Sequence, residues 1–323
     1  MHRVIIDTDV GVDDAHAVYM ALLSPDIHVE GFTTVFGNTD VDNCTQNTLY
    51  LLDLIERTDI PVRQGAGFRL MINEKAELSG KLVHGERGLG NFELPPLQSK
   101  AADGNAIQWL IDTVLANPGE IEILALGPLT NIALATLIEP RWIQAVKRVI
   151  FMGGIITGPG NVLPLSTANI YNDAEAAHIV FHAGYPIVMV GQDVTRWAYL
   201  TPEHKRRMRA KDTKVTRFLE TITEFYEQFY LRSDPSLKDT GHPIHDMLVV
   251  AYLLQPSLFE TEKLYVTVET EGMVTRGQTV ADWRPYSPYP PQMDVCLKVD
   301  NEALFELYLD IITREDMPQP QAA

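Results

Sequence analysis

The sequence has few cysteines and no long hydrophobic run. Its two cysteines, Cys44 and Cys296, lie far apart and provide neither a disulfide framework nor a CxxC metal-binding pair. No apolar stretch approaches the ~18 residues needed to cross a bilayer. The N-terminal residues Met1-His2-Arg3 run directly into Val4 without the apolar core of a signal peptide. We therefore expect a soluble cytoplasmic protein.

Positive charge is also scarce. The chain of 323 residues has 26 Lys and Arg against 43 Asp and Glu, which gives a formal net charge of −17. Such a protein repels nucleic-acid backbones and anionic membrane surfaces, so we expect neither as a partner. Small neutral substrates and metal cations fit this charge better. A hydrophobic content of 46% is enough for a substantial core.

Short apolar runs alternate with segments of helical periodicity over the first two thirds of the chain. This alternation predicts an α/β fold with a Rossmann-like open, mostly parallel sheet flanked by helices. Thr130-Asn131 and Asn172-Asp173 carry side chains typical of helix N-caps. The expected strands are 4–6, 29–36, 121–126, 148–152 and 186–190, and the expected helices lie near 13–23, 41–56, 103–116, 130–138 and 173–183.

The pattern changes between residues 201 and 255, which we interpret as a helical insertion near the working edge of the sheet. It combines a basic stretch with an aromatic-rich segment. Strand patterns return at 264–269 and 293–299, a helix is expected near 301–313, and the proline-rich stretch 282–292 is expected to be a loop. No linker interrupts these segments, so we predict a single domain over 1–323.

Four carboxylates fall within eight residues in the segment Asp7-Thr8-Asp9-Val10-Gly11-Val12-Asp13-Asp14. The segment follows an apolar strand and precedes a helix, which is where open α/β sheets bind ligands. Clustered acids repel one another unless a cation or raised pKa values intervene. Hard oxygen ligands favour Ca²⁺ or Mg²⁺ over zinc. Helix capping explains one or two of the acids only, and the spacing does not match an EF-hand loop.

Two families place a DxD after their first strand. Haloacid-dehalogenase-like phosphatases would use Asp7 as a nucleophile, but Gly11 stands where their motif has Thr or Val. The segment Ile6-Asp7-Thr8-Asp9-x-Gly11-x-Asp13-Asp14-Ala15 instead resembles the signature of the inosine–uridine-type nucleoside hydrolases. Further blocks follow in family order: 33–38 (TTVFGN), 84–90 (HGERGLG), 126–133 (LGPLTNIA), 152–154 (MGG), 160–161, 169–170, 173–177, 245–246 and 275–279 (TRGQT).

The resemblance implies Ca²⁺-dependent hydrolysis of the N-glycosidic bond of ribonucleosides, giving free base and ribose. It assigns the metal to the carboxylates of Asp9, Asp14 and Asp246 and to the carbonyl of Leu126. Asp9 is then our choice of general base for a metal-activated water. Asp7 either lies behind the metal ligands and supports them, or is a purely structural acid. The family commonly forms homodimers or homotetramers, and we expect the same here.

The resemblance also assigns the substrate contacts. On the ribose side, Met152 lies against the sugar or is an ordinary core methionine. His245 matches a general acid for the departing base, and His84 is a second histidine near the base or a structural one. Tyr226 and Tyr230 are candidates for stacking on the base. The remaining ribose contacts are Asp13, Asn38 and Asn169 at the hydroxyls and Asn161 at the 5′ end.

One position departs from the family pattern. Members usually carry a Glu two residues before the position of Asn169, and Thr167 stands there. The family Glu accepts a hydrogen bond from the 5′-hydroxyl, so ordinary nucleosides should bind less tightly here. Two alternatives stay open beside hydrolysis of plain ribonucleosides: an enzyme for 5′-modified ribosides, and a protein that only binds nucleoside or ribose. A phosphatase using Asp7 is the third.

Overall fold

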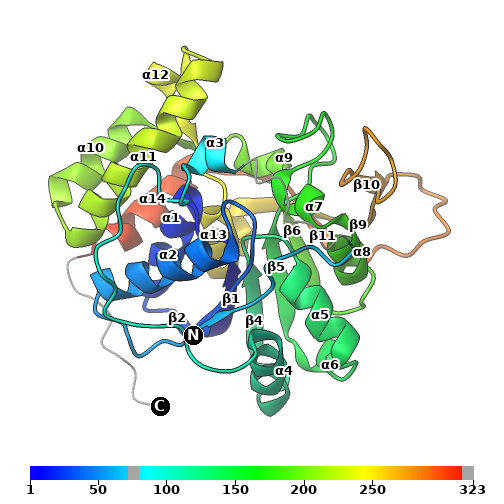
Figure 1. The fold of residues 1–323 in the computed structure, drawn as a ribbon. Coiled ribbons are helices and arrows are strands. Elements are labelled where there is room, and N and C mark those ends of the chain that lie inside the picture. The colour runs from blue at the N-terminus through cyan, green and yellow to red at the C-terminus, as the bar shows by residue number, and fades with distance from the viewer. Residues whose placement is uncertain (72–79, 315–323) are drawn as a thin grey trace.

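A nine-stranded sheet forms the centre of the molecule in the computed structural model, which describes residues 1–71 and 80–314 (Figure 1). The strand order is β10-β9-β11-β6-β5-β4-β1-β2-β3, and the strands from β11 to β3 pair in parallel. Only β9 and β10 run antiparallel to their neighbours within this sheet. The strands are β1 His2–Thr8, β2 Ile27–Thr34, β3 Val62–Gln64, β4 Ile121–Ala125, β5 Arg148–Met152, β6 Ile187–Val190, β9 Phe259–Val268, β10 Thr279–Asp282 and β11 Met293–Val299.

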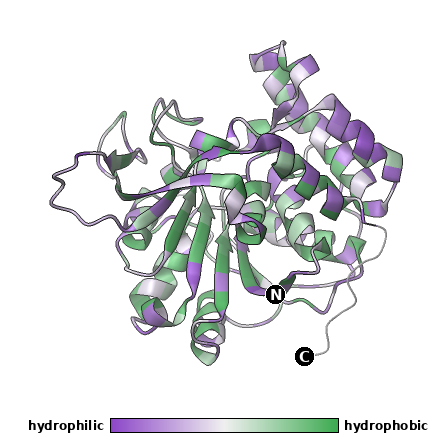
Figure 2. Cartoon of the chain, turned by 180° about the vertical axis from the view of Figure 1, so that it is seen from behind, coloured by the Kyte–Doolittle hydropathy of each residue, from purple (hydrophilic) through white to green (hydrophobic). Residues whose placement is uncertain are grey.

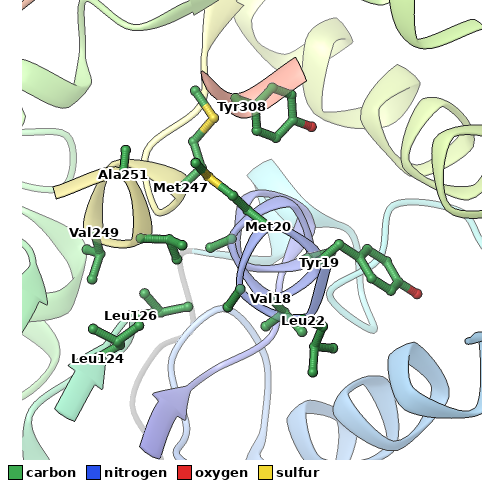
Figure 3. Packing of buried hydrophobic residues seen from close by; sticks show 14 of the residues in the cluster. Val18, Tyr19, Met20, Leu22, Leu124, Leu126, Met247, Val249, Ala251 and Tyr308 are labelled. Atoms are coloured by element: carbon green, nitrogen blue, oxygen red, sulfur yellow. The ribbon is translucent and has the colours of Figure 1, made fainter. Parts of the chain in front are cut away.

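Side chains on each strand alternate between two hydrophobic layers, as a pleated strand requires. On β4, Leu124 packs into the layer beneath α1 and α13, whereas Ile123 and Ala125 face the layer formed with α4, α5 and α8. Figure 3 shows the first layer, where Met20 of α1 and Met247 of α13 lie close together. The longer helices are α1 Val12–Leu23, α2 Val41–Leu54, α4 Ala106–Ala116, α5 Thr130–Ile138, α8 Ala174–Phe181, α10 Pro202–Lys211, α11 Lys214–Ser233, α13 Met247–Leu254 and α14 Asn301–Ile312.

The predicted α/β fold with a mostly parallel sheet is confirmed. The strand expected over 29–36 ends at Thr34, because the chain turns there into the loop toward Asn38. Two edge strands, β3 and β10, were not predicted: they have three and four residues, too few for a clear alternation. Short helices not predicted are α3 Lys81–His84, α6 Trp142–Ala145, α7 Ala168–Asn172 and α9 Gln192–Thr195.

The segment 201–255 is not purely helical. It contains α10, α11 and α12 (Leu237–Thr240), then the two-residue strand β8 (His242–Pro243), which pairs with β7 (Tyr199–Leu200). Its last helix, α13, is almost wholly buried between the sheet and α1, so this helix belongs to the main layer rather than to an insertion. Figure 2 shows the contrast, with hydrophobic strands and hydrophilic surfaces on the projecting helices. No helix in the described ranges is long and apolar enough to span a membrane.

The strand order places a topological switch point between β1 and β4. The chain runs from β1 through β2 to β3 on one side, then returns to β4 and continues to β5 and β6 on the other. β1 and β4 are parallel neighbours, with Asp7 beside Ala125. Ligands of open α/β sheets bind in the crevice at the carboxyl ends of such strands. The aspartate-rich loop after β1 therefore opens into this crevice.

Candidate active site

A cavity of about 260 Å³ lies at this switch point. Its walls come from the loops after β2, β4 and β5, from α1, α3, α7 and α11, and from the two residues before α13. All nine residues that the resemblance assigned to substrate line it, and so do three of the residues assigned to the metal or to catalysis: Asp13, Asn38, His84, Met152, Asn161, Thr167, Asn169, Tyr226 and Tyr230, with Leu126, His245 and Asp246.

Asp14 is held from three sides directly behind the cavity. The Thr8 hydroxyl donates to its Oδ1 at 2.6 Å, and the Gly11 amide donates to its Oδ2 at 2.9 Å. The Asn38 side-chain amide donates to the same Oδ2 at 2.9 Å. The bond from Gly11 also caps the start of α1, so Asp14 does have the capping role considered for it. The other contacts fix its carboxylate more firmly than a cap requires.

Two glycines lie so close to the Asp9 carboxylate that a side chain at either position would collide with it. A Cβ atom on Gly37 would lie 2.0 Å from Asp9 Oδ2, and one on Gly127 would lie 2.7 Å from Asp9 Oδ1. The Asn38 amide donates to Oδ2 at 2.8 Å. Oδ1 is buried and has no hydrogen-bond partner in the described part of the chain. This oxygen is therefore free to bind a cation or to accept a proton.

The carboxylates of Asp13, Asp14 and Asp246 converge, with one oxygen of each within 4.8 Å of the others. Burial raises the pKa of Asp246 well above its usual range, and the charges of Asp13 and Asp14 raise it further. Each such pair repels by about 4 kcal/mol at ~4 Å with an effective dielectric of ~20. Helix capping contributes only ~1 kcal/mol and cannot offset this repulsion.

A hard cation fits this donor set. All the converging groups are carboxylates, and no Lys or Arg lies among the described residues that line the cavity. Buried oxygens of Asp9 and Asp13 lack hydrogen-bond partners within the described ranges, as expected for atoms that bind a metal. The closest trio includes Asp13, which we had assigned to the ribose. The Leu126 carbonyl, assigned to the metal, accepts a hydrogen bond at 2.5 Å from Asn169.

Asp7 lies behind this cluster at the end of β1. Its Oδ1 accepts bonds at 2.5 Å from the Thr33 hydroxyl and at 2.7 Å from the Asn131 side-chain amide, and burial raises the pKa of Asp7 to about 6. The prediction that Thr130-Asn131 caps α5 is therefore wrong: the N-cap is Leu129, and Asn131 instead bonds Asp7. A buried carboxylate without donors costs more than a missing cap, which explains this outcome.

Aromatic and imidazole groups form the side of the cavity toward α11. His245 contacts the Thr195 hydroxyl through Nδ1 at 2.9 Å and the Tyr230 hydroxyl through Nε2 at 3.0 Å. This series of hydrogen bonds continues from the Tyr230 hydroxyl to the Tyr226 hydroxyl at 3.3 Å and from the Tyr226 hydroxyl to Asp13 Oδ2 at 3.4 Å. The tyrosine hydroxyls thus link His245 to the carboxylate cluster. Burial lowers the pKa of His245, and the charge of Asp13 opposes this effect.

His84 joins the same side from the short helix α3. The Val12 amide donates to its Nδ1 at 3.1 Å, so the ring proton resides on Nε2. Burial lowers the pKa of His84 to about 4, which keeps the ring neutral at pH 7. Its ring packs against Tyr226 at a centroid distance of 5.3 Å. His84 is therefore both held structurally and presented to the cavity.

The opposite side of the cavity is the segment 152–169, which we call the ribose wall. Asn169 donates through Nδ2 to the carbonyls of Leu126 and Met152, at 2.5 and 3.1 Å. The Asn161 Oδ1 accepts from the Ala168 amide at 3.0 Å, which leaves the Nδ2 donor of Asn161 for a ligand. Thr167 accepts through Oγ1 from the Gly154 amide at 2.7 Å, so its hydroxyl already holds the backbone of the wall.

Apolar side chains complete the cavity, and the sequence analysis did not assign these to the site. They are Leu82 and Val83 on α3, Val162 and Ala168 in the ribose wall, and Phe229 on α11. Phe229 lies one turn from Tyr226 on the aromatic helix, which is the only sequence signal that pointed to any of them. The others are ordinary hydrophobic residues without a distinguishing motif.

Residues 4–306 match the family model of the inosine-uridine preferring nucleoside hydrolases. This chain belongs to that family. Its reaction class is therefore hydrolysis of an N-glycosidic bond, as expected from the aspartate motif. The family resemblance inferred from the sequence is confirmed over nearly the whole chain.

Individual relatives agree with this placement. The chain is 35% identical to an inosine-uridine preferring nucleoside hydrolase of Leishmania major, over 98% of this chain and 99% of that protein. It is 35% identical to a probable uridine nucleosidase 2 of Arabidopsis thaliana, over 95% and 96% of the two chains. Among solved structures, a purine-preferring ribonucleoside hydrolase from Gardnerella vaginalis superimposes with a TM-score of 0.90 at 32% identity, covering 96% of this chain and 98% of that one.

The confinement of Asp9 gives a direct test of the site. Gly37→Ala places a Cβ atom against Asp9 Oδ2 and should displace this carboxylate. We expect kcat/KM for uridine to fall by ~10²-fold or more, the scale on which a general base contributes. Gly67→Ala, in the loop after β3, is the control, because within the described residues its Cβ would meet only Val41, at 3.2 Å. Full activity in a folded Gly37→Ala variant would show that Asp9 is not needed.

Proposed function

We propose that this protein hydrolyses ribonucleosides to free base and ribose with a Ca²⁺ ion held by its aspartate cluster. The observation that carries the proposal is the convergence of three buried carboxylates, Asp13, Asp14 and Asp246, at a cavity whose walls offer hydroxyl-binding and imidazole groups. Unpaired buried oxygens of Asp9 and Asp13 add to this donor set. The proposed ligands are Asp9, Asp14 and Asp246 with the Leu126 carbonyl. Asp13 lies close enough to join them or to bind a ribose hydroxyl beside them.

Calcium suits this site better than magnesium. Ca²⁺ accepts six to eight oxygens at irregular angles, whereas Mg²⁺ keeps several waters and uses one or two carboxylates. A bound Ca²⁺ would lower the pKa of a coordinated water and hold it toward the anomeric carbon. The free Oδ1 of Asp9 is the acceptor that we assign to the proton of this water. The surrounding carboxylates would also stabilise positive charge that develops on the ribose ring.

The departing base needs a proton or a hydrogen bond, and we assign this role to His245. It lines the cavity and is linked through Tyr230 and Tyr226 to Asp13, whose negative charge favours the protonated, proton-donating form of the imidazole. His84 presents a second ring toward the same side. The tyrosines, which we had considered for stacking on the base, are assigned instead to this chain of hydroxyls.

The calcium prediction concerns both activity and stability. The protein treated with chelator should lose hydrolysis of uridine and inosine, and Ca²⁺ should restore it. Binding only to the folded state should also raise the free energy of unfolding by about 2.7 kcal/mol at a free Ca²⁺ concentration 100 times Kd. Release of reducing sugar measures the reaction, and thermal unfolding with and without Ca²⁺ measures the binding.

The same experiment separates the alternative functions. A sugar phosphate as substrate tests a phosphatase using Asp7, and its hydrolysis with no action on nucleosides would replace the proposal. Calcium-dependent stabilisation without turnover of any nucleoside would favour a binding protein. If neither chelator nor Ca²⁺ changes the activity or the melting temperature, the metal has no part in the mechanism.

His245 should matter according to the leaving group. We expect His245→Ala to lower kcat for uridine and inosine by ~10²–10⁴-fold, the usual contribution of a general acid. Hydrolysis of 4-nitrophenyl riboside should change little, because that leaving group departs as a stable anion. His182→Ala, at an exposed histidine directly after α8, is the control. An equal loss on all three substrates would mean that His245 positions the substrate rather than donating a proton.

Thr167 supports a second candidate function, hydrolysis of 5′-modified ribosides. Its hydroxyl oxygen already accepts the Gly154 amide, and the wall around it offers no carboxylate to a 5′-hydroxyl. Thr167→Glu would add a charge-assisted hydrogen bond of roughly 1.5–3 kcal/mol. We expect the ratio of kcat/KM for uridine over 5′-deoxyuridine to rise by about tenfold or more. Thr167→Gln controls for size, and an unchanged ratio in both variants would show that position 167 does not read the 5′ end.

Three expectations from the sequence stay predictions. They are the homodimeric or homotetrameric state, the cytoplasmic location and the single-domain organisation over 1–323. We assign the base to the side of the cavity formed by α11 and α3, where hydroxyl and imidazole groups suit either a purine or a pyrimidine.

A further inference from the structure

The turn between β9 and β10, residues 269–278, approaches the cavity from outside. With Thr279 it carries the whole TRGQT block, to which neither the metal site nor the substrate contacts assign a role. None of these residues lines the cavity. In Figure 1 the turn projects next to α7 and the loop that precedes it, and it contacts the ribose wall at both ends of that segment.

The first contact is at the start of the ribose wall. The Oγ1 of Thr279 accepts from the Ile155 amide at 2.8 Å and donates to the Ile155 carbonyl at 2.6 Å. Thr279 is buried, and a Cβ atom on Gly154 would lie 2.8 Å from its methyl group. Gly154 itself donates to Thr167. The Thr279 hydroxyl thus fixes the backbone of Ile155, next to Gly154, the residue that Thr167 binds.

The second contact is at the far end of the wall. The Ser166 hydroxyl donates to the Arg276 carbonyl, and Ser166 forms an isolated β-bridge with Gln278. Gly277 has a φ of +75°, and a Cβ atom on it would lie 2.8 Å from the Cα of Tyr171. The turn therefore packs directly against the backbone on both sides of Thr167 and Asn169.

The turn is itself anchored to the helix layer. Arg276 forms a two-pronged ion pair with Glu175 of α8, at 2.8 and 2.6 Å, and donates to the Thr270 carbonyl at 2.5 Å. Parallel bonds of this kind fix a guanidinium in both direction and distance. The ribose wall is consequently supported by the turn between β9 and β10, which α8 itself holds in place.

We propose that Thr279 and Arg276 are positioning residues for the ribose wall: they hold the backbone of Ile155 and Ser166 so that Asn161, Thr167 and Asn169 meet the sugar. The inference rests on the proposed function for its kinetic consequence. The wall binds parts of the sugar away from the bond that breaks, so its contacts contribute about equally to the ground state and the transition state. Losing its alignment should raise KM and leave kcat nearly unchanged.

Thr279→Val tests this, because it removes the hydroxyl and keeps the methyl contact with Gly154. We expect KM for uridine to rise about five- to tenfold, the effect of losing roughly one hydrogen bond, with kcat within about twofold. The kcat/KM ratio of uridine over 5′-deoxyuridine should fall, because the variant loses alignment of groups that meet the 5′ end. Thr279→Ser restores the hydroxyl and should restore both values. Met273→Ser, at a side chain 97% exposed on the same turn, is the matched control.

A readout that needs no catalysis separates this inference from the proposed function. Amide hydrogen exchange over residues 153–167 should be about tenfold faster in Thr279→Val, with residues 4–14 unchanged. Glu175→Gln, which weakens the anchor of Arg276, should act in the same direction if Thr279→Val does not fold. A wild-type protein without activity would overturn the proposed function only. Unchanged exchange over 153–167, or an active wild type with equal losses on both nucleosides, would overturn the positioning role.

Discussion

Mutual repulsion among Asp9, Asp13, Asp14 and Asp246 is the constraint around which the rest of this structure is arranged. Burial removes the water that would screen these charges and raises the pKa of all four carboxylates, and the charges of neighbouring acids raise the pKa of Asp9, Asp14 and Asp246 further. The fold holds them together with backbone and hydroxyl donors rather than with basic side chains. An Arg or Lys in the cluster would neutralise it permanently, whereas neutral donors leave the charge available to the cation that we propose.

Two glycines show how strictly the cluster limits its surroundings. Gly37 and Gly127 follow β2 and β4, the neighbours of β1, and any side chain at either position would meet the Asp9 carboxylate. These three adjacent strands thus end in backbone that closes around one acid. This geometry requires the strand order at the switch point, because only adjacent parallel strands bring their carboxyl ends to the same place.

The parts of the fold that follow from local pattern were predictable, and those that depend on distant partners were not. Buried parallel strands read as apolar runs, and the helix start after Asp173 shows a capping side chain that the structure uses. Asn131 has equally good local cap chemistry but turns to Asp7, because a buried carboxylate needs donors more than a helix end does. The edge strand β10 exists through its pairing with β9, which no short window of sequence reveals.

The same division applies to the site. Residue identities came from ordered motifs, and the nine residues assigned to substrate do line one cavity. The hydrogen bonds that these residues make did not follow from the motifs. Thr167 accepts a hydrogen bond from the Gly154 amide, and the Leu126 carbonyl accepts one from Asn169. The apolar lining residues Leu82 and Val83 carry no chemical signature, so only tertiary structure identifies them.

Three separate parts of the chain support the three sides of the cavity. The carboxylate floor is built from the loops after β1, β2 and β4 and from the residue before α13. The side with the tyrosines rests on α11, which the buried His16 ties to the core through Thr223 at 3.0 Å and Tyr308 at 2.5 Å. The ribose wall rests on β10. Because few residues are shared among these supports, a substitution in one of them can alter one side of the cavity while the other two stay in place.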